Sequence, residues 1–202
     1  MNKRKIFNDP VYGFISIPYD IVFDIIEHPI FQRLRRIQQL GLSSLVYPGA
    51  THSRFHHSLG AMHLMSKSLE VLKSKGNTIT EAESEAAVLA ILMHDLGHGP
   101  FSHALEGVLV ENIPHENISL LLMEKLSVEF GEKIEVAIQI FNNTYPKKFL
   151  HQLVSGQLDM DRMDYLNRDS FYSGVSEGVI GYDRILNMLD VHEGNIVVEE
   201  KG

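Results

Sequence analysis

The chain has 202 residues, of which 44% are hydrophobic and 22% are charged, the composition of a single globular domain or slightly more. No apolar run approaches the roughly 18 residues that a membrane span needs, and the formal net charge of -8 argues against nucleic acid as the main partner. The absence of cysteine excludes disulfides, zinc–thiolate sites and thiol nucleophiles, and since no apolar segment follows the basic start of the chain, we expect no secretory signal and a cytoplasmic location.

The first third of the chain predicts turns followed by helices. Residues 3–17 contain Asn8-Asp9-Pro10 and predict turns with short extended pieces. Residues 41–53 predict a loop with a turn at Pro48-Gly49, and Ser53 is a suitable cap for the helix that follows. The arginines of residues 31–40 have two readings, a solvated helix face or a surface that reads anions or bases. Helices are predicted where apolar residues recur at helical spacing, over residues 19–27, 31–40 and 54–73.

The segment of residues 80–103 predicts a buried helix that ends in a histidine–aspartate pair. Thr80 and Glu83 form a capping box at its start, and residues 86–93 are eight unbroken apolar residues. His94 and Asp95 follow at once, so they leave the helix inside the protein or at the floor of a cleft. The glycines and proline of residues 97–100 then stop the helix.

A carboxylate at this position needs a partner. Asp95 is expected to be buried, and it lies at the end of the helix where the dipole disfavours an anion. A divalent cation over the seam between His94 and Asp95 would remove both objections, with its other positions left for ligands from distant elements. The alternative is a hydrogen-bonded His–Asp pair that holds no metal.

Residues 157–169 carry four carboxylates within eleven positions. Asp161, Asp164, Tyr165 and Arg168 fall on one face of a predicted helix. This face is either solvated or supplies a missing metal ligand. Further elements are predicted in the second half of the chain: helices over residues 104–110, 116–129, 131–141 and 182–189, and a small hairpin over 191–199.

A cation held by His94 and Asp95 needs two more nitrogen or oxygen ligands, for which His57 and Asp161 are candidates. Such a set suits one divalent transition metal, Mn, Fe, Co, Ni or Zn, and accepts Mg. Arg54 and Arg162 could hold phosphate oxygens. Spare histidines could protonate a leaving oxygen, but spacing alone does not separate ligands from acids. The absence of a Gly-x-x-x-x-Gly-Lys loop argues against P-loop chemistry.

Five blocks of the sequence follow one another in the order found in a known family: residues 7–13, 31–41, 47–60, 94–103 and 159–165. In these blocks the chain resembles the HD-domain phosphohydrolases, and among them the deoxynucleoside triphosphate triphosphohydrolases of the animal SAM-and-HD-domain type. The resemblance implies a mainly α fold, an HD-domain helical bundle with a small β-hairpin near the C-terminus. It implies hydrolysis at the α-phosphorus, which yields a deoxynucleoside and inorganic triphosphate.

The resemblance also implies a role for individual residues. The metal ligands would be His57, His94, Asp95 and Asp161. The phosphates would lie along His98, His103 and His115, with His103 as general acid and Glu106 in place of the family's orienting Asp. Arg54, Arg162 and Tyr165 would hold phosphates, Asp169 the sugar 3′-hydroxyl, and Gln39 and Leu40 the base. A nucleotide activator would bind Asn8, Glu27, Gln32 and Arg35, where Glu27 replaces an Asp of the family.

Two further functions stay open beside dNTP hydrolysis. One is hydrolysis of another nucleotide phosphate ester, such as a monophosphate or a cyclic nucleotide. The other is a non-catalytic HD module that binds nucleotides. The family continues for about another domain of ~100–200 residues, so we expect residues 1–202 to be a single HD domain truncated at its C-terminal end, and the full-length form to be a homo-oligomer.

Overall fold

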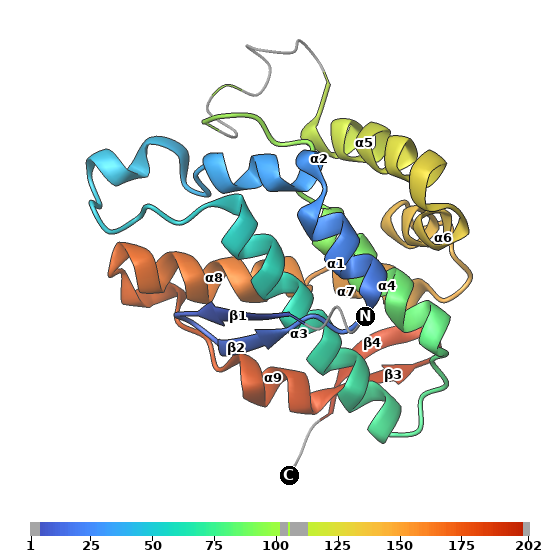
Figure 1. Ribbon diagram of the computed structural model, residues 1–202. Coiled ribbons are helices and arrows are strands. Elements are labelled where there is room, and N and C mark those ends of the chain that lie inside the picture. Colours follow the sequence, from blue (N-terminus) through green and yellow to red (C-terminus); the bar gives the residue numbers. More distant parts are fainter. Residues whose placement is uncertain (1–4, 102–104, 106–112, 200–202) are drawn as a thin grey trace.

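Three helices form the centre of the molecule. In the computed structural model, which describes residues 5–101, 105 and 113–199, helix α3 (Arg54–Ser74) packs against α4 (Glu81–Met93) on one side and α8 (Met160–Ser173) on another (Figure 1). The apolar faces of these helices supply much of one continuous hydrophobic core. The ends of all three helices that carry the predicted site residues therefore lie near one another.

The second half of helix α4 is buried on all sides, as its unbroken apolar sequence predicts. It packs against α3, α6 (Glu132–Phe141) and α7 (Lys148–Val154), so no face of its second half is left for solvent. Its capping box is present: the Glu83 N–H donates to Thr80 Oγ1 over 3.1 Å, and the Thr80 N–H donates to Glu83 Oε2 over 2.8 Å. These bonds satisfy two backbone groups that a helix start leaves without partners.

Shorter helices surround this centre, and most lie within two residues of the predicted bounds. The predicted helix over 104–110 falls outside the described residues, apart from Leu105. Within the described part of the chain, no helix is both long and apolar enough to cross a membrane. The surrounding elements are α1 (Asp20–Glu27), α2 (Pro29–Gln32), α5 (His115–Phe130), α9 (Tyr182–Met188) and the short 3-10 helix η4 (Ser176–Gly178).

Two antiparallel hairpins complete the fold. Strands β1 (Ile6–Asp9) and β2 (Gly13–Ser16) pair with Ile6 opposite Ser16, and β2 contacts α3. Strands β3 (Leu189–His192) and β4 (Asn195–Val198) form the predicted C-terminal hairpin. Its two turn residues, Glu193 and Gly194, both have positive φ, 49° and 79°, as the favoured two-residue hairpin turn requires.

The prediction of one helix over residues 31–40 is wrong. Helix α2 gives way to a 3-10 helix, η1 (Arg33–Arg36), and Ile37 is extended. Residues 37–39 pair instead with the segment before α3: the Arg54 N–H donates to the Ile37 carbonyl over 2.9 Å, and the Gln39 N–H donates to the His52 carbonyl over 3.0 Å. The predicted loop over 41–53 also contains a 3-10 helix, η2 (Gly41–Leu45).

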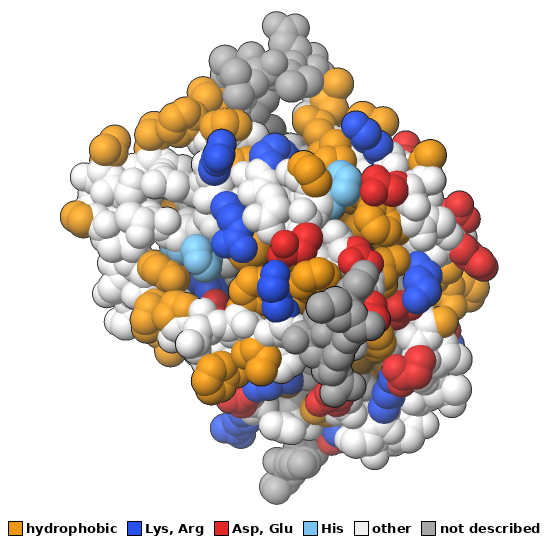
Figure 2. Space-filling view, viewed as in Figure 1, with side chains coloured by type: hydrophobic (Ala, Val, Ile, Leu, Met, Phe, Trp, Pro, Cys, Tyr) orange, Lys and Arg blue, Asp and Glu red, His pale blue; other side chains and the backbone are white. Residues whose placement is uncertain are grey.

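The arginines of this segment do not share one solvated face. Arg33 is half-buried and donates to the carbonyls of Leu96 and His98, so it fastens the loop after α4. The guanidinium of Arg35 lies 3.6 Å from the centre of the Phe55 ring. On the face shown in Figure 2, Lys and Arg side chains are interspersed with Asp and Glu side chains.

Candidate metal centre

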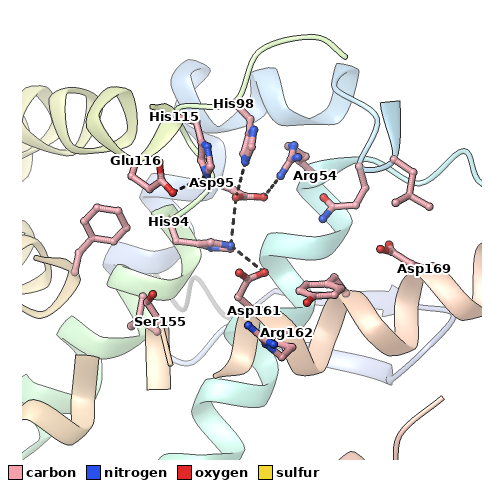
Figure 3. Close-up of a pocket in the computed structure, with 15 residues that line it drawn as sticks. Arg54, His94, Asp95, His98, His115, Glu116, Ser155, Asp161, Arg162 and Asp169 are labelled. Atoms are coloured by element: carbon pink, nitrogen blue, oxygen red, sulfur yellow. Dashed lines mark hydrogen bonds and ion pairs between the residues drawn. The ribbon is translucent and has the colours of Figure 1, made fainter. Parts of the chain in front are cut away.

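Four side chains from three helices converge at one point. His57 comes from the first turn of α3, His94 and Asp95 follow α4, and Asp161 lies in the first turn of α8. Figure 3 shows His94, Asp95 and Asp161 pointing toward one another. His57 Nε2 lies 3.2 Å from His94 Nε2, 3.1 Å from Asp161 Oδ1 and 3.7 Å from Asp95 Oδ2; His94 Nε2 lies 3.4 Å from Asp95 Oδ1 and 3.6 Å from Asp161 Oδ1.

The outer nitrogens of both imidazoles are already bound to the protein. His57 Nδ1 is 2.8 Å from Asp164 Oδ2, and His94 Nδ1 is 2.6 Å from the carbonyl oxygen of Ile91. Since these acceptors take the Nδ1 protons, each ring in its neutral form turns the lone pair of Nε2 toward the shared point. Histidine ligands of metals are oriented in this way, so the residues fit a divalent cation.

The pKa values of the clustered side chains also favour a bound cation. Burial alone would lower the pKa of His57, but hydrogen bonds to Asp161 and Asp164 outweigh it and raise that pKa to about 10. Burial would raise the pKa of Asp161, but its hydrogen bonds to the two histidines hold it well below its usual range. The carboxylates thus favour positive charge at the shared point, and a bound cation would displace protons from the imidazoles.

An ion-pair network beneath His57 was missed by the sequence analysis. Asp164 and Arg168 are completely buried, and the Arg168 guanidinium donates to Asp164 Oδ2 over 2.9 Å and to Asp9 Oδ2 over 2.7 Å. A Cβ on Gly60 of α3 would overlap both side chains of the pair, so only glycine leaves room for them. The solvated-face reading of this helix is therefore wrong for Asp164 and Arg168.

A second group forms where α5 begins. The Gly97 N–H donates to Ser119 Oγ over 2.8 Å, and that hydroxyl donates to the His94 carbonyl over 2.7 Å. A side chain on Gly97 would overlap the main chain of α5, so glycine is needed for the first turns of α5 to pack against the loop after α4. This contact stacks the rings of His98 and His115, with centroids 3.8 Å apart.

His98 connects the two groups. Its Nε2 lies 3.3 Å from Asp95 Oδ1. Burial lowers the pKa of His98 to about 4, and the positive charge of Arg54 acts in the same direction against the attraction of Asp95. His98 is therefore neutral near pH 7.

A cavity of about 480 Å³ opens over both groups (Figure 3). All six residues expected to bind substrate line this cavity, together with His94, Asp95, Asp161, His98 and His115. His57 does not line it, because its side chain is fully buried. Four lining residues were not expected: Glu116, Phe141, Val154 and Ser155. The six expected residues are Gln39, Leu40, Arg54, Arg162, Tyr165 and Asp169.

Six expected residues remain, two catalytic ones and the four of the activator site. His103 and Glu106 fall outside the described residues. Gln32 and Arg35 are hydrogen-bonded to each other over 2.7 Å and line a surface cavity of about 560 Å³. Neither Asn8 nor Glu27 lines that cavity in the described structure, and Glu27 pairs with Lys5 over 2.9 Å.

Comparison with known proteins places this architecture. Residues 54–169 match the family described as the HD domain. The chain belongs to the HD-domain family. This membership confirms the resemblance found in the sequence and the mainly α fold. The chain spans about half or less of the length of the curated relatives it matches.

Three similar proteins illustrate the match. The chain is 37% identical to the uncharacterized protein YwfO of Bacillus subtilis over 212 residues, 100% of this chain and 48% of that protein. It is 35% identical to the deoxynucleoside triphosphate triphosphohydrolase SAMHD1 homolog of Dictyostelium discoideum, over 96% of this chain and 41% of that one. A crystal structure of a phosphohydrolase from Bacteroides thetaiotaomicron superposes with a TM-score of 0.94 at 61% identity, over 97% of this chain and 49% of that chain.

Proposed function

We propose that the protein is a metal-dependent phosphohydrolase that cleaves dNTPs to a deoxynucleoside and inorganic triphosphate. The proposal rests on one observation. Four candidate ligands, His57, His94, Asp95 and Asp161, converge beside a cavity that is also lined by Arg54 and Arg162. Relatives named as deoxynucleoside triphosphate triphosphohydrolases support the substrate class.

His57, His94, Asp95 and Asp161 would hold one divalent cation. Two imidazoles and two carboxylates suit Mn, Fe, Co, Ni or Zn, and tolerate Mg. When bound, such a cation polarises a phosphoryl oxygen and lowers the pKa of a water molecule.

The chain's own residues then bind and orient the nucleotide. Arg54 and Arg162 lie on opposite sides of the cation ligands in Figure 3, where each guanidinium can donate to phosphate oxygens. The neutral ring of His98 lies beside Asp95, where its Nε2 can donate to the carboxylate and help to orient it as a cation ligand. Tyr165 and His115 complete this wall of the cavity.

The rest of the cavity would take the nucleoside. Asp169 lies farther along α8, away from the cation ligands, and is proposed to accept from the sugar 3′-hydroxyl (Figure 3). Gln39 and Leu40 would contact the base. The proposal also includes binding of a nucleotide activator at Asn8, Glu27, Gln32 and Arg35, and assembly of the protein into a homo-oligomer.

The products of dNTP cleavage test the proposal. Metal-loaded protein is incubated with each dNTP, and phosphorus NMR identifies the phosphate product. Release of inorganic triphosphate supports the proposal. Orthophosphate or pyrophosphate release would assign the site to another phosphate ester, and nucleotide binding without any product would make the protein a binding module. The Asp161→Ala variant is the negative control.

A further inference from the structure

His52 contacts Asp169, at the end of the cavity proposed to take the nucleoside, and its side chain is completely buried. His52 Nε2 is 2.7 Å from Asp169 Oδ1, and the imidazole stacks on the ring of Tyr172 with centroids 4.5 Å apart and an angle of 21°. His52 Nδ1 is buried and has no hydrogen-bond partner among the described residues. Because an ionised carboxylate only accepts hydrogen bonds, Nε2 is the nitrogen that carries the proton.

The main chain of His52 contacts a second cavity residue. Its carbonyl oxygen accepts the Gln39 N–H over 3.0 Å. Gln39 Oε1 is buried and has no hydrogen-bond partner in the described part of the chain. One residue therefore holds both Asp169, through its side chain, and Gln39, through its backbone.

Asp169 depends on His52 for its orientation. The Asp169 side chain is 23% exposed, and no contact to a Lys or Arg side chain is found for it among the described residues. With Oδ1 fixed by His52, Oδ2 remains to accept a hydrogen bond from a ligand in the cavity. A donor that an oriented carboxylate accepts is the hydroxyl group of a sugar.

We propose that His52 is a positioning residue that makes the site selective for nucleotides with a sugar 3′-hydroxyl, by fixing the carboxylate of Asp169. This inference rests on the proposed function. His52 touches neither the reacting phosphate nor the cation ligands, so its loss affects discrimination between sugars and leaves metal content unchanged.

The test compares dATP with 2′,3′-dideoxy-ATP, which lacks the hydroxyl group. His52→Phe keeps a ring that stacks on Tyr172 but cannot donate, whereas His52→Gln places an amide N–H near the position of Nε2. We expect His52→Phe to raise KM for dATP about tenfold, the equivalent of one hydrogen bond to a charged group. The preference for dATP over the dideoxy nucleotide falls by the same factor, and His52→Gln restores most of it.

A matched substitution controls for the loss of a histidine. His192→Phe changes an exposed residue of the C-terminal hairpin and should leave the preference intact. If His52→Phe, folded by circular dichroism and with normal metal content, keeps the wild-type preference, the proposal is overturned. It is equally overturned if turnover of both nucleotides falls by the same factor.

A measurement without turnover separates this inference from the proposed function. If the wild-type protein releases no triphosphate, the proposed function fails, but nitrogen NMR of the 202-residue chain still decides the role of His52. We expect His52 to carry its proton on Nε2, with slow exchange that Asp169→Ala abolishes. A His52 protonated on Nδ1, or an Nε2 proton indifferent to Asp169→Ala, contradicts the positioning role.

Discussion

A carboxylate lies at each end of helix α4, and the protein stabilises the two carboxylates in different ways. Glu83, at the start, accepts hydrogen bonds from the Thr80 N–H, Lys147 and Tyr145 over 2.8 to 3.0 Å. Asp95, just past the end, contacts Arg54 and three histidines, and Asp161 adds a second negative charge nearby. The helix dipole favours an anion at the start and disfavours one at the end.

This difference shows where an external ligand is needed. At the start of α4 the protein supplies every partner of Glu83, so that end serves stability. At the other end two carboxylates and two imidazoles share one point, and a cation would satisfy all four. The proposed function is therefore concentrated at the end of the helix that is electrostatically less favourable.

The largest effect is expected from Asp161→Ala, which removes one carboxylate from the shared point. Metal retention and turnover should both be abolished, since two imidazoles and Asp95 leave the cation one ligand short. Metal analysis and triphosphate release on the same sample check this. Metal retained at full stoichiometry would contradict the ligand assignment.

A smaller effect, on stability, is expected from Gly60→Ala. The added methyl group would overlap Asp164 and Arg168 and force the buried pair apart, which costs about 3 to 5 kcal/mol. Urea unfolding measures the loss. Gly181→Ala is the matched control, because its Cβ would meet no atom within 4 Å, and it should change the free energy of unfolding by less than about 0.5 kcal/mol. Equal losses in both variants would show that the buried pair has room to adjust.

The smallest effect is expected at the start of α4. Glu83→Gln keeps an acceptor for the capping box but removes the charge, and should cost about 1 to 2 kcal/mol at pH 7. Burial raises the pKa of Glu83, but Lys147, Thr80 and Tyr145 outweigh it, and the pKa lies below its ordinary value of 4.5.

The sign of the pH dependence follows from that lowered pKa. The charge of Glu83 contributes stability above about pH 4.5, and the contribution is lost as the pH falls through the lower pKa of the folded state. Wild type and Glu83→Gln should therefore converge in unfolding free energy at acidic pH. A constant gap from pH 7 to pH 3 would assign the loss to packing instead of charge.

Local signals in the sequence predicted most of this architecture. The capping box and the apolar run of α4 located His94 and Asp95, because both patterns depend on neighbouring residues. The helix predicted over 31–40 failed because Ile37 and Gln39 pair with a segment more than ten residues away, which no local period records. His57 and Asp161 could be named as candidates by residue type, but only the fold brings them to His94.

The missed network has a similar cause. Asp164 and Arg168 are four residues apart on a helix, a spacing that suits an exposed salt bridge equally well. Their burial depends on Gly60 and Asp9, which lie in other elements. A single sequence does not show that these four positions touch.

The contact of Asp9 with Arg168 has an evolutionary consequence. Asp9, Gly60, Asp164 and Arg168 form one unit in which loss of either carboxylate leaves a guanidinium in the protein interior with too little compensation. Among natural variants these four positions should therefore be inherited together or replaced together. A homologue that keeps three of them and changes the fourth should carry a second alteration within the same contact shell.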